Sequence, residues 1–513
     1  MTVVGQIRKG AYFDSVSLMQ CGKAVAGMAG IVDAAVAMGT RSNRAILESA
    51  GLLLEQFRES GDTDLLIAVK AETEAAAETA LAAVDGILRR KRSSGGGELR
   101  PWSMEGALQA LPGANLALIS VAGRYAGNEA LRALEHGLHV MLFSDNVSLE
   151  QEIELKQCAR GKGLLMMGPD CGSAIINGVP LGFANAVRRG DIGMVAAAGT
   201  GLQEVTCIIS NAGAGISQAI GTGGRDVKRE VGGIMLLEGL KALAGDDATK
   251  VIVVVSKPPH PEVLEKIQSL ITTIAKPVIA IFVGASGKDQ PSSLEQAALT
   301  AVAVARGEGR ARVVEQLAAR EQQIAEQAAR LAIKRKPGQR YVRGLFSGGT
   351  FCAEAQVLFS GMLEDVYSNA PAGRGLRLED ALRSRGNTVI DLGEDEFTVG
   401  RPHPMIDYSL RNRRIRHEAA DPQTAVVLLD VVLGYGANPD PAAELSAVLR
   451  EAVQQVAVVC SITGTDQDPQ NRSAVQTRLE ADGAIVMPSN AAACKLAAYM
   501  VQARGGKCVA QTV

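Results

Sequence analysis

The chain has 513 residues, of which 47% are hydrophobic and 21% charged, and its formal net charge is −2. This length is too great for one hydrophobic core and predicts three or four domains. Because 53 basic residues balance 55 acidic ones, the chain lacks the basic excess typical of proteins that bind nucleic acid or membrane surfaces. We therefore expect neither of these as a partner.

The hydrophobic segments are short. The longest, such as Val251–Val255, have the length of a strand and not of a membrane span. Residues 1–4 do not resemble the start of a secretion signal, so a cytoplasmic location is expected. The eight cysteines form no Cys-x-x-Cys pair and the five histidines do not cluster with them. We therefore predict reduced thiols and no metal site.

The many glycines and the Ala/Val/Ile runs are typical of α/β units joined by tight turns. Residues 1–90 are predicted to form an N-terminal α/β domain with strands at Val3–Ile7, Ala34–Met38 and Leu65–Val69. Residues 91–114 are predicted to be a linker, because four cations at positions 89–92 lead into a Ser/Gly run.

Three further regions follow the linker. Residues 115–190 alternate strands and helices and are predicted to form a Rossmann-like domain. Residues 191–335 and 340–513 each begin with a strand, a glycine turn and a helix, and both are predicted to be flavodoxin-like. Their Val/Ile-rich strands indicate parallel sheets that are covered on both faces. The expected fold class is therefore α/β throughout.

Each of the last two regions opens on an unusual turn. In one, apolar residues lead into Gly199, Thr200 and Gly201; in the other, they lead into Ser347, Gly348, Gly349 and Thr350. A helix N-terminus offers free N–H groups and a partial positive charge, so it holds anions without a cationic side chain. We predict that the two turns face one another and share one phosphate. For each turn alone, an ordinary strand-to-helix connection is the alternative.

Two loops at strand ends are candidates for binding a substrate, since open α/β sheets bind ligands at the carboxyl ends of their strands. The first loop places Asp170 directly after a Gly-Pro turn. The second loop contains Gly223, Gly224 and Arg225.

Several motifs occur in the order found in the α subunit of succinyl-CoA synthetase, and residues 340–513 resemble the C-terminal part of its β subunit. The motifs are Met167–Cys171, Val195–Glu204, Gly221–Asp226, Lys276–Val278 and Val283–Gly284. The Gly-Ala-Tyr-Phe-Asp-Ser-Val segment near the N-terminus and the order of all four units resemble the FdrA proteins, the fused members of this superfamily. The resemblance implies a CoA-binding-type domain at residues 115–190 and two ligase-type domains after it.

The chain departs from the synthetase at the phosphate carrier. In the synthetase, a histidine after the strand that corresponds to Val278–Val283 carries the phosphate, whereas residues 284–294 of this chain contain no histidine. The acidic partner of that histidine falls where this chain has Ser256–His260, which contains no acidic residue. No CoA-phosphate fingerprint is evident before Leu116, and no ATP-grasp domain is evident. The resemblance therefore implies twin phosphate-binding helices without a phosphohistidine.

This pattern suits a phosphate, or an acyl or carbamoyl phosphate, that reacts directly between the two helices. The resemblance to FdrA proteins implies a subunit of an oxamate carbamoyltransferase in allantoin and purine degradation, with partner subunits from the same operon. That enzyme converts oxalurate and phosphate to oxamate and carbamoyl phosphate. No cofactor is assigned, and CoA or a nucleotide is a further candidate ligand.

The candidate catalytic residues are Lys257, Arg401 and His403. With Arg225, they are expected to bind a carboxylate or polarise a carbonyl, since guanidinium groups match planar carboxylates. A structural or solvated role is the alternative for each. Two other functions stay open for the chain: an acyl-CoA synthetase whose ATP is handled by a separate chain, and a non-catalytic scaffold or regulatory subunit.

Overall fold

The computed structural model describes residues 2–11, 13, 15–40, 43–44, 47–48, 50–92, 101, 103–285, 290–398 and 402–503. The chain divides into two compact units, of which the first comprises residues 1–115, 120–132 and 395–402 and the second comprises residues 116–119, 133–394 and 403–513. Within the described parts of the chain, no helix is both long and apolar enough to cross a membrane.

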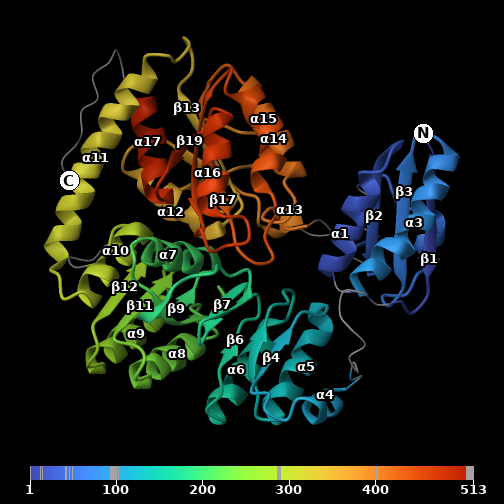
Figure 1. The fold of residues 1–513 in the computed structure, drawn as a ribbon, viewed down its shortest axis with the longest axis horizontal. Coiled ribbons are helices and arrows are strands. Elements are labelled where there is room, and N and C mark those ends of the chain that lie inside the picture. Colours follow the sequence, from blue (N-terminus) through green and yellow to red (C-terminus); the bar gives the residue numbers. More distant parts are fainter. Residues whose placement is uncertain are drawn as a thin grey trace. The chain divides into compact units, whose positions relative to one another are not determined.

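The first unit is built on a three-stranded antiparallel sheet with the strand order β1-β3-β2 (Figure 1). Its elements are β1 (Thr2–Arg8), α1 (Ser15–Ala26), β2 (Ile31–Met38), η1 (Glu55–Phe57), β3 (Leu65–Ala71), α3 (Glu74–Arg92), α4 (Met104–Ala110) and α13 (Asp395–Thr398), while α5 (Gly123–Glu135) has residues in both units. The central strand is covered on both faces: Ile67 and Val69 join the core with α1 and α3, and Leu66 and Ala68 pack with Phe57. The three strands predicted in residues 1–90 are confirmed.

The second unit contains three further sheets. The smallest is parallel and has the order β4-β5-β6. Its strands are β4 (Leu116–Ile119), β5 (His139–Leu142) and β6 (Met166–Met167), and α6 (Leu149–Gly161) connects the last two.

The second sheet of this unit has six strands in the order β12-β11-β9-β10-β7-β8. Its strands are β7 (Ser173–Ile176), β8 (Val179–Gly182), β9 (Arg189–Ala197), β10 (Ile216–Gly221), β11 (Val251–Ser256) and β12 (Val278–Phe282). Its helices are α7 (Gly199–Asn211), α8 (Ile234–Gly245), α9 (Pro261–Thr273), α10 (Leu294–Ala305) and α11 (Arg310–Ala332). The four strands from β9 to β12 run parallel, as the Val/Ile-rich sequence predicts.

Strands β7 and β8 form a hairpin that is absent from the predicted elements. They are joined by Asn177 and Gly178, which both have a positive φ (52° and 82°), as a two-residue type I′ turn requires. The hairpin pairs antiparallel with β10. The six-stranded sheet therefore includes residues that precede the expected boundary at residue 190.

Alternate residues of the central strand β9 explain how this sheet is covered. Met194 and Ala196 pack in a core with α7 and α10, whereas Val195 and Ala197 pack with α8 and α9 on the other side. Side chains of a strand alternate between the two faces of its sheet, so a strand that is apolar throughout is buried on both.

The third sheet of this unit has seven strands, all parallel, in the order β15-β14-β16-β13-β17-β18-β19. Its strands are β13 (Tyr341–Phe346), β14 (Val366–Ser368), β15 (Leu376–Arg377), β16 (Asn387–Asp391), β17 (Thr424–Val432), β18 (Ala457–Thr463) and β19 (Ile485–Met487). Its helices are α12 (Gly349–Ser360), α14 (Ser409–Ala420), α15 (Pro441–Ala452), α16 (Arg472–Ala481) and α17 (Asn490–Gln502). The expected α/β class with parallel sheets is confirmed.

One hydrophobic core joins the six-stranded and seven-stranded sheets. It includes residues of α7 and α10 beside the first sheet and of α12 and α17 beside the second. Helix α11 lies along α17 (Figure 1), where Glu321 pairs with Lys495 and accepts a hydrogen bond from the Tyr499 hydroxyl. The two sheets are therefore parts of one packed body.

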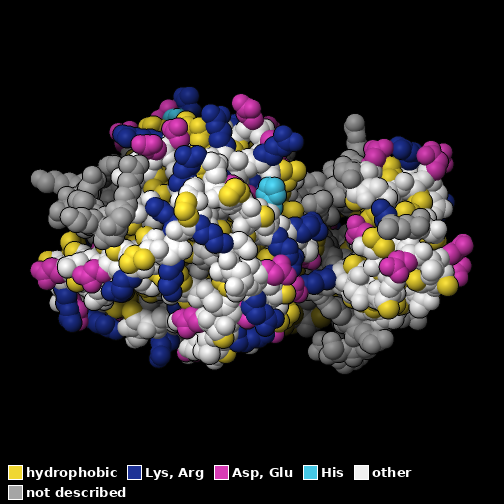
Figure 2. All heavy atoms as spheres, turned by 90° about the horizontal axis from the view of Figure 1, so that it is seen from above, with side chains coloured by type: hydrophobic (Ala, Val, Ile, Leu, Met, Phe, Trp, Pro, Cys, Tyr) yellow, Lys and Arg dark blue, Asp and Glu magenta, His cyan; other side chains and the backbone are white. Residues whose placement is uncertain are grey.

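The surface carries charges of both signs. Figure 2 shows basic, acidic and uncharged side chains interspersed over one face. This mixture agrees with the small net charge of −2.

Candidate functional site

The turns before α7 and α12 are built alike. Strand β9 leads through Ala198 into α7, and β13 leads through Ser347 and Gly348 into α12. Neither N-cap residue, Ala198 or Gly348, makes a side-chain hydrogen bond to its helix. The strand–turn–helix form predicted for both turns is confirmed, and both helix starts lack the usual cap.

The two helix starts lie directly against one another. A Cβ placed on Gly201 would lie 3.0 Å from Thr350 Cγ2, and a Cβ on Gly348 would lie 2.8 Å from both Cγ2 and Oγ1 of Thr200. Side chains at these glycine positions would push the helices apart, because packed interiors tolerate added methyl groups poorly. The turns therefore face one another, while the ligand that they hold stays a prediction. We call residues 199–201 and 347–350 the twin-helix site.

Two threonine residues of the twin-helix site are largely buried. Thr200 is 8% exposed and Thr350 is 3% exposed, and among the residues that the structure describes neither hydroxyl has a hydrogen-bond partner. A hydroxyl group that has no partner in the protein remains able to donate to a polar ligand or to water.

Part of the predicted phosphate site already holds a carboxylate. The backbone N–H groups of Ser347 and Gly348 donate to Asp430 at 2.8 and 2.9 Å, and the Ser347 hydroxyl donates to Asp430 at 2.8 Å. Asp430 is fully buried at the end region of β17 and pairs with the buried Arg411 at 3.0 Å. The groups of Ser347 and Gly348 that were predicted to bind phosphate thus bind the Asp430 carboxylate instead. A carboxylate can accept hydrogen bonds from free N–H groups as a phosphate would.

A second carboxyl group covers the start of α12. A Cβ on Gly349 would lie 2.6 Å from Asp391 Oδ2 and 3.6 Å from Lys257 Nζ. Asp391 ends β16, whereas Lys257 follows β11 in the other sheet. Burial raises the pKa of Asp391 to about 7, although the Lys257 charge acts to lower it. The structure thus brings the predicted residue Lys257 to the twin-helix site, beside an acid that was not predicted.

His403 also lies at this carboxyl group. A Cβ on Gly393 would lie 3.0 Å from His403 Nε2 and 3.1 Å from Asp391 Oδ1. Burial lowers the pKa of His403 to about 4, so the ring is neutral near pH 7. Because Nδ1 accepts a hydrogen bond from Met405 N at 3.2 Å, the ring proton sits on Nε2. The third predicted catalytic residue, Arg401, lies outside the described residues.

The predicted substrate-binding residues lie on two loops in mutual contact. Gly223 has a φ of 80°, and a Cβ on it would clash with the carbonyl oxygen of Pro169. The neighbouring Asp170 is exposed and also has a positive φ, 55°, whereas a Cβ on Gly224 would meet no atom within 4 Å. The loop after β6 of the three-stranded sheet therefore meets the loop after β10 of the six-stranded sheet, and each loop follows the carboxyl end of its strand.

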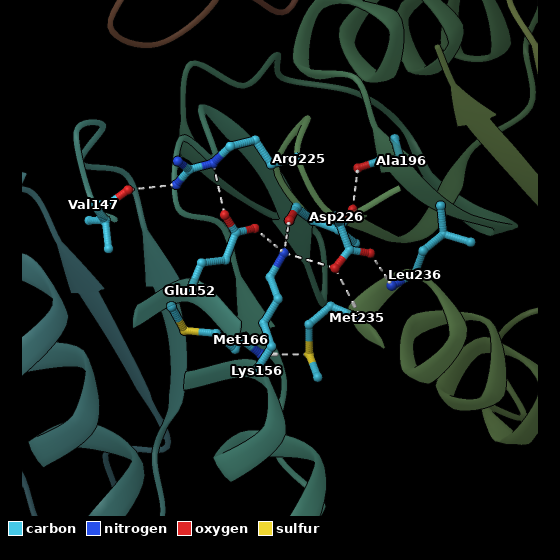
Figure 3. A network of polar contacts seen from close by, with 10 residues as sticks. Val147, Glu152, Lys156, Met166, Ala196, Arg225, Asp226, Met235 and Leu236 are labelled. Atoms are coloured by element: carbon cyan, nitrogen blue, oxygen red, sulfur yellow. Dashed lines mark hydrogen bonds and ion pairs between the residues drawn. The ribbon is translucent and has the colours of Figure 1, made fainter. Parts of the chain in front are cut away.

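Arg225 belongs to a buried ion-pair network (Figure 3). Its guanidinium group pairs with Glu152 Oε2 at 2.8 Å and donates to the carbonyl of Val147 at 2.9 Å. The Arg225 side chain is 33% exposed, while that of Glu152 is fully buried. Both contacts fix Arg225 within the protein, which favours the structural alternative for this residue.

Lys156 is the centre of the same network. Its ammonium group donates to Glu152 at 2.8 Å, to Asp226 at 2.8 Å and to the carbonyl of Thr222 at 2.9 Å. The Asp226 carboxylate in turn accepts the N–H of Leu236 at 2.8 Å at the start of α8 (Figure 3). The network ties α6 to the loop after β10, because each buried charge has a partner of opposite sign.

Sequence reasoning missed Asp391, Asp430 and Arg411. Both aspartates come late in apolar strands, after Val389–Ile390 and after Leu428–Leu429. Carboxylates in such positions lie at the ligand-binding edge of a parallel sheet, and this signal was available. Arg411 lies within a run of charged residues on α14, a pattern that resembles a solvated helix face.

Comparison with protein families agrees with this architecture. The CoA-ligase family model matches residues 345–500, and the CoA binding domain model matches residues 188–284, which hold the first of the twin helices. A third model, described as an AllF heavy metal-associated domain, matches residues 1–101. Within the described residues, no group of three or more His, Cys, Asp and Glu side chains is placed to hold a metal ion.

Two regions of this α/β chain thus resemble acyl-CoA synthetase-like proteins through the CoA-ligase and CoA binding domain models. The chain is 40% identical over 504 residues to the uncharacterized protein YahF of Escherichia coli (strain K12), with 96% of each chain covered. The chain belongs to the same family as YahF.

More distant relatives cover less of the chain. The succinate–CoA ligase [ADP-forming] subunit alpha of Staphylococcus aureus (strain Mu50) is 25% identical over 178 residues, which span 34% of this chain and 57% of that subunit. Among solved structures, a dinucleotide-forming acetyl-coenzyme A synthetase 1 of Ca. Korarchaeum cryptofilum is 15% identical with a TM-score of 0.29, covering 76% of this chain and 83% of the other. An ATP citrate lyase from Methanothrix soehngenii is 23% identical with a TM-score of 0.31, covering 37% and 33%. These two TM-scores are low and support no statement on function.

Proposed function

We propose that this chain is the phosphate-handling subunit of an FdrA-type oxamate carbamoyltransferase. The reaction is oxalurate plus phosphate to oxamate plus carbamoyl phosphate. The observation that carries the proposal is the contact between the N-termini of α7 and α12, with the Thr200 and Thr350 hydroxyls unpartnered between them. Helix termini, hydroxyl groups and the Lys257 ammonium are the donors that a phosphate dianion needs.

The electrostatics of the twin-helix site favour an anion on the α7 side. The start of α7 has no side-chain cap, whereas Asp430 already accepts the N–H groups of Ser347 and Gly348 at α12. An incoming phosphate would therefore use the N–H groups of residues 199–201 and the Thr200 hydroxyl, with Lys257 and Thr350 on the other side. Preorganised donors of this kind also stabilise the charge that develops at an attacked carbonyl.

The absence of a histidine from residues 284–294 supports direct transfer. In the synthetase that this chain resembles, such a histidine carries the phosphate between two sites. Without it, the phosphate oxygen must itself attack the carbonyl carbon of the substrate at the twin-helix site. Proximity and orientation then supply much of the rate acceleration.

The second candidate function is an acyl-CoA synthetase that works with a separate ATP-binding chain. The match of residues 188–284 to a CoA binding domain and the likeness to the succinate–CoA ligase alpha subunit favour it. In either case partner subunits from the same operon complete the enzyme.

The test is an assay of the chain co-expressed with its operon neighbours. Phosphate release from carbamoyl phosphate is measured with and without oxamate, and oxalurate is quantified as the product. Oxamate-dependent release with oxalurate formation supports the carbamoyltransferase. Thioester formation from ATP, CoA and a carboxylate, without that release, supports the synthetase instead. If neither activity is detected while the chain still binds its partners, a scaffold function is favoured.

A further inference from the structure

Asp391 is a buried acid aimed into the twin-helix site. It is 3% exposed, and its Oδ1 accepts the N–H of Gly393 at 2.9 Å. Its Oδ2 lies over Gly349, the first residue of α12, and has no hydrogen-bond partner among the residues that the structure describes. One oxygen is thus fixed by the backbone, and the other is open toward the place where the anion is proposed to bind.

The charged groups around Asp391 come from three segments of the second unit. Lys257 faces it from the loop after β11, Asp430 from β17 and Glu394 from the residues just after β16. His403, which is neutral, lies beside Oδ1. Burial, Glu394 and Asp430 raise the pKa of Asp391, whereas Lys257 and the Gly393 N–H lower it, with a result of about 7. Near neutral pH the carboxyl group therefore exists in both protonation states, as a proton-transfer group requires.

We propose that Asp391 is the proton-transfer group of the twin-helix site and that the substrate class is an N-carbamoyl amide, whose leaving atom is a nitrogen. This inference rests on the proposed function, in which no residue is assigned to proton transfer. Lys257 is a positioning residue whose charge favours the ionised form of Asp391, and the Gly393 N–H fixes the Oδ1 side.

The transfer step balances without any further reactant. An oxygen of the hydrogen phosphate attacks the ureido carbonyl carbon of oxalurate, and the new C–O bond forms as the C–N bond breaks. The phosphate proton passes to the Asp391 carboxylate, and the carboxylic acid gives a proton to the departing nitrogen. The products are carbamoyl phosphate and oxamate, and Asp391 ends as it began. In the reverse direction the same carboxylate removes a proton from the oxamate amide.

This acid distinguishes an amide from a thioester as the substrate. An amide nitrogen is a poor leaving group and a poor nucleophile unless a proton is delivered to it or removed from it. A thiol reacts as its thiolate and leaves as such, so it needs no acid in that position. A carboxyl group whose Oδ2 lies over the first residue of α12, open toward the proposed anion position, therefore favours transfer to and from nitrogen.

The first experiment measures whether the Asp391 carboxyl faces the bound anion. Sulfate is the probe, because it remains a dianion between about pH 6 and 8.5, and binding is followed by calorimetry on the full chain. We expect the sulfate affinity of the wild type to fall about tenfold over this range as Asp391 ionises, and that of Asp391→Asn to stay constant. Glu265→Gln, which removes an exposed carboxylate on α9, should behave as the wild type. Equal pH dependence in wild type and Asp391→Asn would overturn the placement.

The second experiment measures the reaction in the complex with the operon partners. Asp391→Asn should lower kcat by a factor of about 10² to 10⁴ with a KM for phosphate within a few-fold of the wild-type value, and Asp391→Glu should keep part of the activity with a shifted pH profile. Retained kcat in Asp391→Asn overturns the inference. If the wild type itself shows no carbamoyl transfer, the proposed function fails together with this transfer step. The sulfate titration then still decides whether Asp391 titrates against a bound anion.

Discussion

Glu204 and Glu354 occupy the same position on the twin helices, the fifth residue after the first one of α7 and of α12. Glu204 accepts the N–H of Asn490, the first residue of α17, at 3.0 Å. Glu354 accepts the N–H of Leu294, the first residue of α10, at 2.7 Å. Each glutamate therefore stabilises a helix start that belongs to the other sheet, and the Asn490 side chain also donates to Glu354 at 2.8 Å. The two glutamates thus make equivalent contacts in opposite directions between the six-stranded and seven-stranded sheets.

The first prediction concerns the pH dependence of stability through Glu354. Burial raises the pKa of its carboxyl group from 4.5 to about 7. Between these values the folded chain holds a proton that the unfolded chain has released, so the free energy of unfolding falls as pH rises from about 4.5 to about 7. Glu354→Gln should remove a contribution of roughly 3 kcal/mol to this fall. Urea unfolding at several pH values measures it, with Glu265→Gln as the exposed control. A slope unchanged by Glu354→Gln would contradict the prediction.

The second prediction tests the contact between the helix starts. Gly348→Ala places a methyl group 2.8 Å from Thr200 Oγ1 and 2.7 Å from Phe351 Cδ2, and it should lower the free energy of unfolding by about 1–3 kcal/mol. In the double variant with Thr200→Ala, part of that loss should return, with a coupling energy of about 1 kcal/mol. The control is Gly245→Ala at the end of α8, where a Cβ meets nothing within 4 Å. Strictly additive effects would show that the helices do not touch.

The two turns were predictable because they are local. An apolar run, a glycine turn and a helical pattern all lie within about a dozen residues, and the hairpin turn at Asn177 and Gly178 was equally readable. The meeting of Asp391 with Lys257 was not predictable in this way. It depends on which strands become neighbours, and β16 lies beside β13 although other strands lie between them in sequence. The order of strands in a sheet cannot be predicted from short segments of a single sequence.

Arg225 and Asp430 show a second limit of predicting a binding site from the sequence. A charged residue in a glycine-rich loop is typical of a ligand site, yet Glu152 from α6 already neutralises Arg225. Similarly, the N–H groups of Ser347 and Gly348 are suited to a phosphate, yet Asp430 occupies them. Sequence patterns identify groups that can bind an anion, whereas only the three-dimensional structure shows that a carboxylate of the same chain is bound there.

The third prediction concerns the buried pair of Arg411 and Asp430. Arg411→Leu would leave the Asp430 carboxylate buried without its cation, and it should cost about 3–5 kcal/mol of unfolding free energy. The double variant Arg411→Leu/Asp430→Asn should recover part of this loss, because the unpaired charge is gone. Arg416→Leu is the matched control on the same helix, since its pair with Glu451 is exposed on both sides, and it should destabilise the fold far less because exposed ion pairs contribute little. Similar losses for Arg411→Leu and Arg416→Leu would refute the special role of the buried pair.

The fourth prediction separates an enzyme from a scaffold. Thr200→Val and Thr350→Val together keep the methyl contacts with Gly348 and Gly201 and remove only the two unpartnered hydroxyls. Hydrogen bonds to a charged group are worth about 1.5–3 kcal/mol each, so the affinity for phosphate or sulfate should fall at least tenfold. The melting temperature and the binding of operon partners should change little. Calorimetric titration measures the affinity, and Thr272→Val on the exposed side of α9 is the control. A wild type that binds neither anion, yet binds its partners, would favour the scaffold, because the glycine turns would then serve only to let two helices meet.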